Sequence, residues 1–169
     1  MEDKFIFFED ENNAKPESTE RWNILVIDDD MDVHVMTTLS LKNIRIHGRG
    51  LNIAHAYSGV EAIAYLKTTM EEGAEATNVD LILLDMVMET KYAGLDVARW
   101  LREDGGKHET PIVILRTGQP GLLTKEEILT NDHFHGMIEK TSVTYHNLVN
   151  LLNQTLSQKK SLVRRANHS

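Results

Sequence analysis

Short apolar runs alternate with longer amphipathic segments along most of the chain. The runs at 24–27, 81–84 and 112–115 are consecutive aliphatic residues, which is typical of strands that are buried on both faces. Two further segments are short enough and apolar enough to be strands of the same sheet. Five strands are therefore predicted, at 24–27, 51–56, 81–84, 112–115 and 136–139.

Helical patterns fill the intervals between these runs. Ser58 with Glu61, and Thr124 with Glu127, have the spacing of capping boxes, which mark helix starts. Because strands and helices alternate, an α/β fold with a parallel sheet covered on both faces is favoured, and right-handed crossovers make that sheet doubly wound. Helices are predicted at 32–43 (with Met36 and Leu39 as apolar positions), from 58 to about 70, at 95–104, after Thr124 and at 141–160.

The two ends of the chain depart from this alternation. Residues 1–22 are rich in acidic and polar side chains and include a proline, so we interpret them as an acidic N-terminal arm. Residues 23–160 form the single predicted domain. Residues 161–169 are interpreted as a C-terminal tail or connector.

Charge and composition exclude several classes of function. The net charge of −8 repels nucleic-acid phosphates, which argues against direct nucleic-acid binding. The chain has no cysteine, so a disulfide framework and a thiolate zinc site are excluded. No apolar run approaches the ~20 residues of a membrane helix, and the apolar run near the start is too short for a signal peptide. We therefore expect a cytoplasmic protein without a membrane partner.

Charged and hydroxyl side chains follow four of the predicted strands. Asp28, Asp29 and Asp30 come after the first strand, Asp85 after the third, Thr117 after the fourth and Lys140 after the fifth. The carboxyl ends of parallel strands meet at one edge of the sheet, so these groups should gather there. Clustered carboxylates repel one another, and a hard cation such as Mg²⁺ relieves that repulsion. Such a set suits the transfer of a phosphoryl group to a carboxylate.

This ordered set of residues resembles the receiver domains of response regulators in two-component systems. The resemblance implies that Asp85 is the phosphoacceptor and that Mg²⁺ is held by Asp28, Asp29, Asp85 and the backbone carbonyl of Val87. It also implies that the Thr117 hydroxyl moves toward the phosphoryl group and that Lys140 contacts it.

The same resemblance implies a fold and a set of partners. The fold would be flavodoxin-like, with a five-stranded sheet in the order 2-1-3-4-5. The phosphoryl donor would be a sensor histidine kinase or a phosphotransfer protein. Phosphorylation would change the face formed by the fourth helix, the fifth strand and the last helix. That face would control an output domain outside this chain or form a homodimer, and the chain itself would not be an enzyme.

Four segments narrow the resemblance to one subgroup of receivers. In that subgroup the receiver precedes a domain of unknown function and often a cyclic-dinucleotide phosphodiesterase of the HD-GYP type. We therefore expect a fragment of such a protein or a stand-alone receiver. The segments are 57–62 (YSGVEA), 83–90 (LLDMVMET), 93–95 (AGL) and 115–121 (LRTGQPG).

Four positions depart from the usual receiver pattern. Glu89 and Thr141 replace prolines, and the second of these is usually cis-bonded to the lysine. Because a cis bond before a residue other than proline is strongly disfavoured, we expect a trans bond after Lys140 and a shifted loop. Met137 replaces a switch aromatic residue, for which Phe134 or His135 are the candidate substitutes. The apolar Val87 predicts slow self-dephosphorylation.

Two other functions remain as alternatives. A haloacid-dehalogenase-like phosphatase also uses an Asp, a Thr, a Lys and magnesium on a doubly wound sheet. However, its pattern requires acidic residues after the lysine, and none follows Lys140. The second alternative is a pseudo-receiver that serves as a docking module without phosphorylation. The intact set of Asp28, Asp29, Asp85, Thr117 and Lys140 argues against it.

Overall fold

A five-stranded parallel sheet forms the centre of the protein. The computed structural model describes residues 20–70, 78–103, 111–118, 134–142 and 144–166. The strand order is β2-β1-β3-β4-β5, which confirms the predicted doubly wound sheet. The strands are β1 (Arg21–Ile27), β2 (Gly50–Ala56), β3 (Leu81–Asp85), β4 (Ile112–Thr117) and β5 (Gly136–Glu139).

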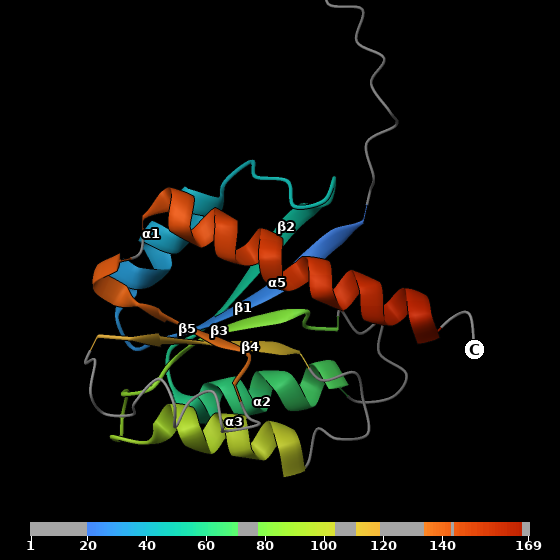
Figure 1. Cartoon of the computed structure of the whole chain (residues 1–169). Helices are drawn as coiled ribbons and strands as arrows, with labels where there is room; N and C mark the ends of the chain where they lie inside the picture. Colours follow the sequence, from blue (N-terminus) through green and yellow to red (C-terminus); the bar gives the residue numbers. More distant parts are fainter. Residues whose placement is uncertain (1–19, 71–77, 104–110, 119–133, 143, 167–169) are drawn as a thin grey trace, which may run out of the picture.

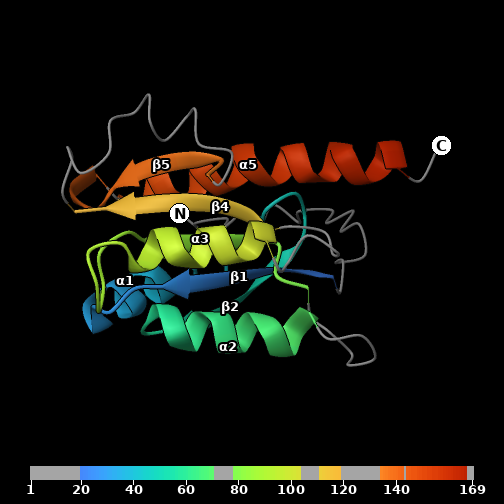
Figure 2. The ribbon, with the colours of Figure 1, turned by 90° about the horizontal axis from the view of Figure 1, so that it is seen from below.

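Helices cover both faces of the sheet, as Figures 1 and 2 show. One face carries α1 (Met31–Leu41) and α5 (Tyr145–Ala166), and the other carries α2 (Gly59–Met70) and α3 (Ala93–Glu103). A 3-10 helix at Lys140–Ser142 joins β5 to α5. The helix predicted after Thr124 lies outside the described residues.

The central strands are apolar because both of their faces are covered. All five residues of β3 and all six of β4 are buried. Their side chains alternate between two core clusters: Leu81 and Leu83 pack on the α1/α5 side, whereas Ile82 and Leu84 pack on the α2/α3 side. Burying each such side chain contributes about 1.5–3 kcal/mol, so these strands hold their carboxyl ends in fixed positions.

Hydrogen bonds from capping residues determine where α1 and α2 begin, near the carboxyl ends of the strands. Asp30 caps α1, with its Oδ1 accepting from the Asp32 amide at 2.9 Å. The capping box predicted for α2 is present. Ser58 Oγ accepts from the Glu61 amide at 3.1 Å, and the Glu61 carboxylate accepts from the Tyr57 amide at 2.8 Å.

The largest differences from the predicted element boundaries are in β1 and α5. The sheet begins at Arg21, inside the segment assigned to the acidic arm, because Trp22 is a core residue. The Trp22 indole is buried and donates to the Ile46 carbonyl at 2.9 Å. The last helix begins at Tyr145 rather than Thr141 and continues to Ala166. Within the described part of the chain, no helix combines the length and the apolar character that crossing a membrane requires.

Candidate functional site

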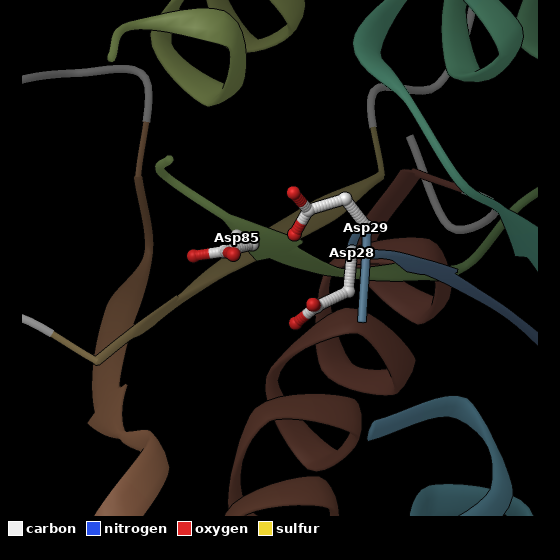
Figure 3. A group of neighbouring side chains, drawn as sticks. All are labelled: Asp28, Asp29 and Asp85. Atoms are coloured by element: carbon white, nitrogen blue, oxygen red, sulfur yellow. The ribbon is translucent and has the colours of Figure 1, made fainter. Parts of the chain in front are cut away.

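Three aspartates meet where β1 and β3 end. Asp28 and Asp29 follow β1, and Asp85 is the last residue of β3, so parallel pairing of the two strands brings the three side chains together, as Figure 3 shows. One oxygen of each carboxylate lies within 4.8 Å of one oxygen of each of the others. Asp28 and Asp85 are buried, whereas Asp29 is exposed. The sequence-predicted acidic site is thus assembled, with one carboxylate open to solvent.

Lys140 joins the two buried carboxylates. Its Nζ lies 2.8 Å from Asp85 Oδ2 and donates to Asp28 Oδ1 at 3.1 Å. Burial by itself lowers the pKa of Lys140, but hydrogen bonds and charge interactions with Asp85 and Asp28 outweigh burial and raise that pKa overall. Lys140 is therefore a permanent ammonium at the site.

The acidic groups still exceed the positive charge that contacts them. Burial raises the pKa of Asp85, the hydrogen bond from Lys140 opposes that rise, and the Asp28 carboxylate adds to it. Asp28 Oδ2 lies 2.9 Å from Lys140 Nζ, but the geometry favours Oδ1 as the acceptor. This buried Oδ2 has no hydrogen-bond donor among the described residues. Three neighbouring carboxylates with one ammonium in contact with them among the described residues keep a net negative charge, which fits a hard divalent cation.

Thr117 and Val87 occupy the positions that the sequence indicated. Thr117 ends β4, is mostly buried, and lies beside Glu139 of the neighbouring β5. The Val87 amide lies 3.4 Å from Asp85 Oδ1, and the Val87 side chain packs against the core cluster on the α2/α3 side. The metal-binding role of the Val87 carbonyl and the switch role of Thr117 stay predictions.

Two hydrogen bonds and close packing at Gly94 hold the loop after Asp85 in place. The Gly94 amide donates to the Met86 carbonyl at 3.0 Å, and a Cβ on residue 94 would collide with the carbonyl oxygen of Asp85. Glu89, which replaces a proline, accepts a hydrogen bond from the Gly59 amide at 2.8 Å. The substitution therefore ties this loop to the first turn of α2.

The structure also places the residues at the other positions that differ from the usual receiver pattern. The Lys140–Thr141 bond is trans, as expected from the absence of proline. Phe134 is buried in the core cluster on the α2/α3 side, and Met137 packs against that cluster. His135 accepts the Val113 amide hydrogen at Nδ1, at 3.0 Å. Phe134 and His135 thus both contact the sheet or its core.

Sequence reasoning assigned no role to Arg116 or to two histidines beside the site. Arg116 is buried on β4, and its Nη1 donates to Thr37 Oγ1 at 3.0 Å. His34 Nε2 lies 2.7 Å from the carbonyl oxygen of Asp28, and His34 Nδ1 lies 2.8 Å from His55 Nδ1. For Arg116 the available signal was a charged residue directly after the apolar run 112–115, whereas the apolar pattern of α1 gave no signal for His34.

Comparison with known families decides the assignment. The family model described as "Response regulator receiver domain" matches residues 24–153. The chain belongs to the response regulator receiver family. The haloacid-dehalogenase alternative is therefore not favoured.

The relatives of this receiver agree with the fold and the expected subgroup. The chain is 35% identical over 135 residues to 3'3'-cGAMP-specific phosphodiesterase 2 of Vibrio cholerae. That alignment covers 80% of this chain and 24% of the relative, so the receiver corresponds to about a quarter of the longer protein.

Two solved structures show the same fold. The receiver domain of an HD domain-containing protein from Pseudomonas fluorescens Pf-5 has a TM-score of 0.62 at 19% identity, covering 84% of this chain and 99% of that one. The chemotaxis protein CheY4 of Vibrio cholerae has a TM-score of 0.60 at 18% identity, covering 80% and 98%.

Proposed function

We propose that Asp85 of this receiver accepts a phosphoryl group from a sensor histidine kinase or a phosphotransfer protein. The observation that supports this most directly is the contact of the buried Asp85 carboxylate with Lys140, inside a cluster of three aspartates. A nucleophilic carboxylate needs a nearby cation to offset the charge of an approaching phosphoryl group. Lys140 supplies that charge within hydrogen-bond distance of Asp85 Oδ2.

The transfer is a displacement at phosphorus. An Asp85 oxygen forms the new bond to phosphorus, and the bond between phosphorus and the donor histidine nitrogen breaks. The electron pair of that bond leaves with the imidazole, and the product is an acyl phosphate. Lys140 stays beside the developing charge, and the Thr117 hydroxyl is proposed to donate to a phosphoryl oxygen.

Mg²⁺ is the proposed cofactor. Asp28, Asp29 and Asp85, with the Val87 carbonyl, are the residues that would hold it. The cation would neutralise phosphoryl oxygens and carboxylates together. The grouping of three carboxylates, two of which are buried, supports this assignment.

The proposed phosphodonor docks on α1. This helix begins at Met31 and is capped by Asp30, which directly follows the proposed metal-binding pair, and its surface carries four exposed apolar side chains. A partner that covers them brings its phosphohistidine next to Asp85, and exposed apolar clusters mark interaction sites. The side chains are Met31, Val35, Met36 and Leu39.

The proposed output is a conformational change at β5 and α5, together with the helix predicted after Thr124. Thr117 and Lys140 lie at the ends of β4 and β5, so a phosphoryl group on Asp85 would favour one arrangement of that edge. We propose that this edge controls an output domain outside the chain, or a homodimer. The relatedness to a cyclic-dinucleotide phosphodiesterase makes such an enzyme the favoured output. In this proposal the receiver is not itself an enzyme, and its location is cytoplasmic.

Intact-mass spectrometry after incubation with acetyl phosphate and Mg²⁺ tests the function. We expect one added phosphoryl group on the wild type and none on Asp85→Asn or without Mg²⁺. Asp96→Asn is the matched control, because Asp96 is an exposed carboxylate paired with Arg99 on α3; it should behave as wild type. Addition to Asp85→Asn would contradict the assignment of Asp85.

The same samples separate the remaining alternatives. If the wild type gains no phosphoryl group while binding Mg²⁺, the docking-module function is supported instead. If the group is added, its decay over time measures the slow self-dephosphorylation predicted from Val87, and loss within minutes would contradict that prediction.

A further inference from the structure

A buried guanidinium lies on the same side of the sheet as the acidic site. Arg116 is opposite Asp85 in the register of β3 and β4, and only 4% of its surface is exposed. Its Nη1 donates to Thr37 Oγ1 of α1 at 3.0 Å, and Thr37 is itself buried. The side chain is thus held between the sheet and α1.

Arg116 forms no ion pair within the part of the chain that the structure describes. The Nε of the guanidinium is also buried without a hydrogen-bond acceptor there. Removing a charge from water without a partner costs several kcal/mol. Burial accordingly lowers the pKa of Arg116, and the carboxylates of Asp28 and Asp85 act against that lowering. Because Arg116 lies opposite Asp85 in the sheet register, the favourable charge interaction of this buried cation is with the carboxylates of Asp85 and Asp28.

That interaction is reciprocal. A cation that the carboxylates stabilise from a distance must oppose any further cation that binds to the same carboxylates. It must favour any anion that binds there. Lys140 also carries a positive charge, but its side chain is 22% exposed and contacts the carboxylates directly. Arg116 is enclosed and tethered, so its charge cannot move aside.

We propose that Arg116 is a fixed second cation of the site, which weakens the binding of Mg²⁺ alone and strengthens the binding of Mg²⁺ together with a phosphoryl group. The proposal rests on the function proposed above, in which Asp85 accepts that group. Arg116 acts through space and touches no reacting atom. Its charge makes the affinity of the site for Mg²⁺ depend on whether a phosphoryl group is bound.

A purely structural role predicts a different result. If Arg116 only holds α1 on the sheet through Thr37, its loss would loosen the site and weaken the binding of cation and anion alike. The electrostatic role predicts opposite changes for the two ligands. The sign of the Mg²⁺ effect therefore distinguishes the two roles.

Isothermal titration calorimetry of the full chain with MgCl₂ is the first measurement. Arg116→Gln removes the charge and retains a donor for Thr37, and Arg116→Lys retains the charge. We expect the Mg²⁺ Kd of Arg116→Gln to fall about tenfold, and that of Arg116→Lys to stay within about twofold of wild type. Thr37→Val, which removes only the acceptor, should also leave the Kd unchanged. An unchanged or higher Kd in Arg116→Gln would overturn the proposal.

The second measurement uses beryllium fluoride at saturating Mg²⁺ as a mimic of the phosphoryl group. Its apparent Kd should rise about tenfold in Arg116→Gln and stay near wild type in Arg116→Lys. Thermal melts establish that each variant is folded, and Arg116→Met replaces Arg116→Gln if the latter does not fold. The Mg²⁺ titration needs no phosphorylation, so its outcome is independent of whether wild-type Asp85 accepts phosphate.

Discussion

The two edges of the sheet use the same residue types for different purposes. At the amino edge, Asp80 precedes β3, and each of its carboxylate oxygens has a partner: Lys159 Nζ lies 3.0 Å from Oδ1, and the Asn23 amide donates to Oδ2 at 2.9 Å. At the carboxyl edge, Asp28 and Asp85 both contact the ammonium of Lys140, and no other ion pair to them occurs in the described part of the chain. The Asp29 carboxylate lies beside them, so negative charge exceeds positive charge among the described groups at this edge.

This difference separates a charge that stabilises the fold from charges that await a ligand. A half-buried carboxylate such as that of Asp80, whose oxygens each have a partner, is well compensated, and removing a partner is costly. Where neighbouring carboxylates outnumber the cations beside them, their repulsion destabilises the ligand-free protein. A bound cation removes that repulsion and so stabilises the folded state. The same aspartate side chain is therefore structural at one edge and functional at the other.

Replacing Lys140 should have the largest effect. Lys140→Met removes the cation that contacts both Asp28 and Asp85, so the rate of phosphoryl addition from acetyl phosphate should fall by about 10²-fold or more. The measurement is the time course of intact mass. Lys159→Met, at the opposite edge, is the control and should keep at least about half of the wild-type rate. Equal losses in both variants would contradict the separation of the two edges.

Removing one carboxylate from each edge should change stability in opposite directions. Asp80→Asn leaves Lys159 without its anion, and we expect a loss of about 2–3 kcal/mol in the free energy of unfolding. Asp28→Asn removes a repelling charge, and we expect a gain of about 1 kcal/mol in the absence of metal. Urea denaturation in EDTA measures both. Destabilisation by Asp28→Asn would show that this edge is balanced without a ligand.

Glu89 offers a smaller test, because it is a carboxylate at the carboxyl edge whose partner is a backbone amide. Glu89→Ala removes the acceptor for the Gly59 amide at the start of α2, and the loss of such a cap costs about 1 kcal/mol. The melting temperature should fall, while Asp85 should still take up one phosphoryl group. A complete loss of phosphorylation would place Glu89 in the reacting site.

The smallest expected effect is a pH dependence from the histidine pair behind Asp28. Burial lowers the pKa of His55, and the neighbouring His34 lowers it further. Because the folded-state pKa lies below the unfolded value of about 6.5, the unfolded chain binds protons first as the pH falls. The stability tied to His55 is therefore complete above about pH 6.5 and decreases as the pH falls below it.

Urea denaturation at pH 7.5 and pH 5.5 tests this dependence. His55→Gln should lose less stability than the wild type over this interval, whereas His146→Gln, an exposed histidine on α5, should lose as much as the wild type. If His55→Gln loses as much free energy of unfolding between pH 7.5 and pH 5.5 as the wild type, the prediction is contradicted.

The sequence predicted the site well wherever strand ends determine position. The apolar runs identified all five strands, and parallel strands carry their carboxyl ends to one edge, so the gathering of Asp28, Asp85 and Lys140 followed from chain order alone. The Lys140–Thr141 bond was predictable because only proline makes a cis bond common.

The inward face of α1 was not predictable from its apolar pattern. Met36 and Leu39 are the apolar positions of that pattern, yet both are mostly exposed, whereas His34 and Thr37 are buried. These two polar side chains face inward because they meet the Asp28 carbonyl and the Arg116 guanidinium. Asp28 directly follows β1 and Arg116 lies on β4, so only the tertiary structure reveals the need for polar groups there.

Gly94 shows how strictly a position can be constrained without contributing a side chain. Any Cβ at this position would occupy the space of the Asp85 carbonyl oxygen, because α3 begins directly against the backbone of that residue. In a saturation-mutagenesis library, position 94 should therefore tolerate none of the other nineteen amino acids. A genetic screen alone would class Gly94 with Asp85 as an essential residue, although its contribution is the room that it leaves.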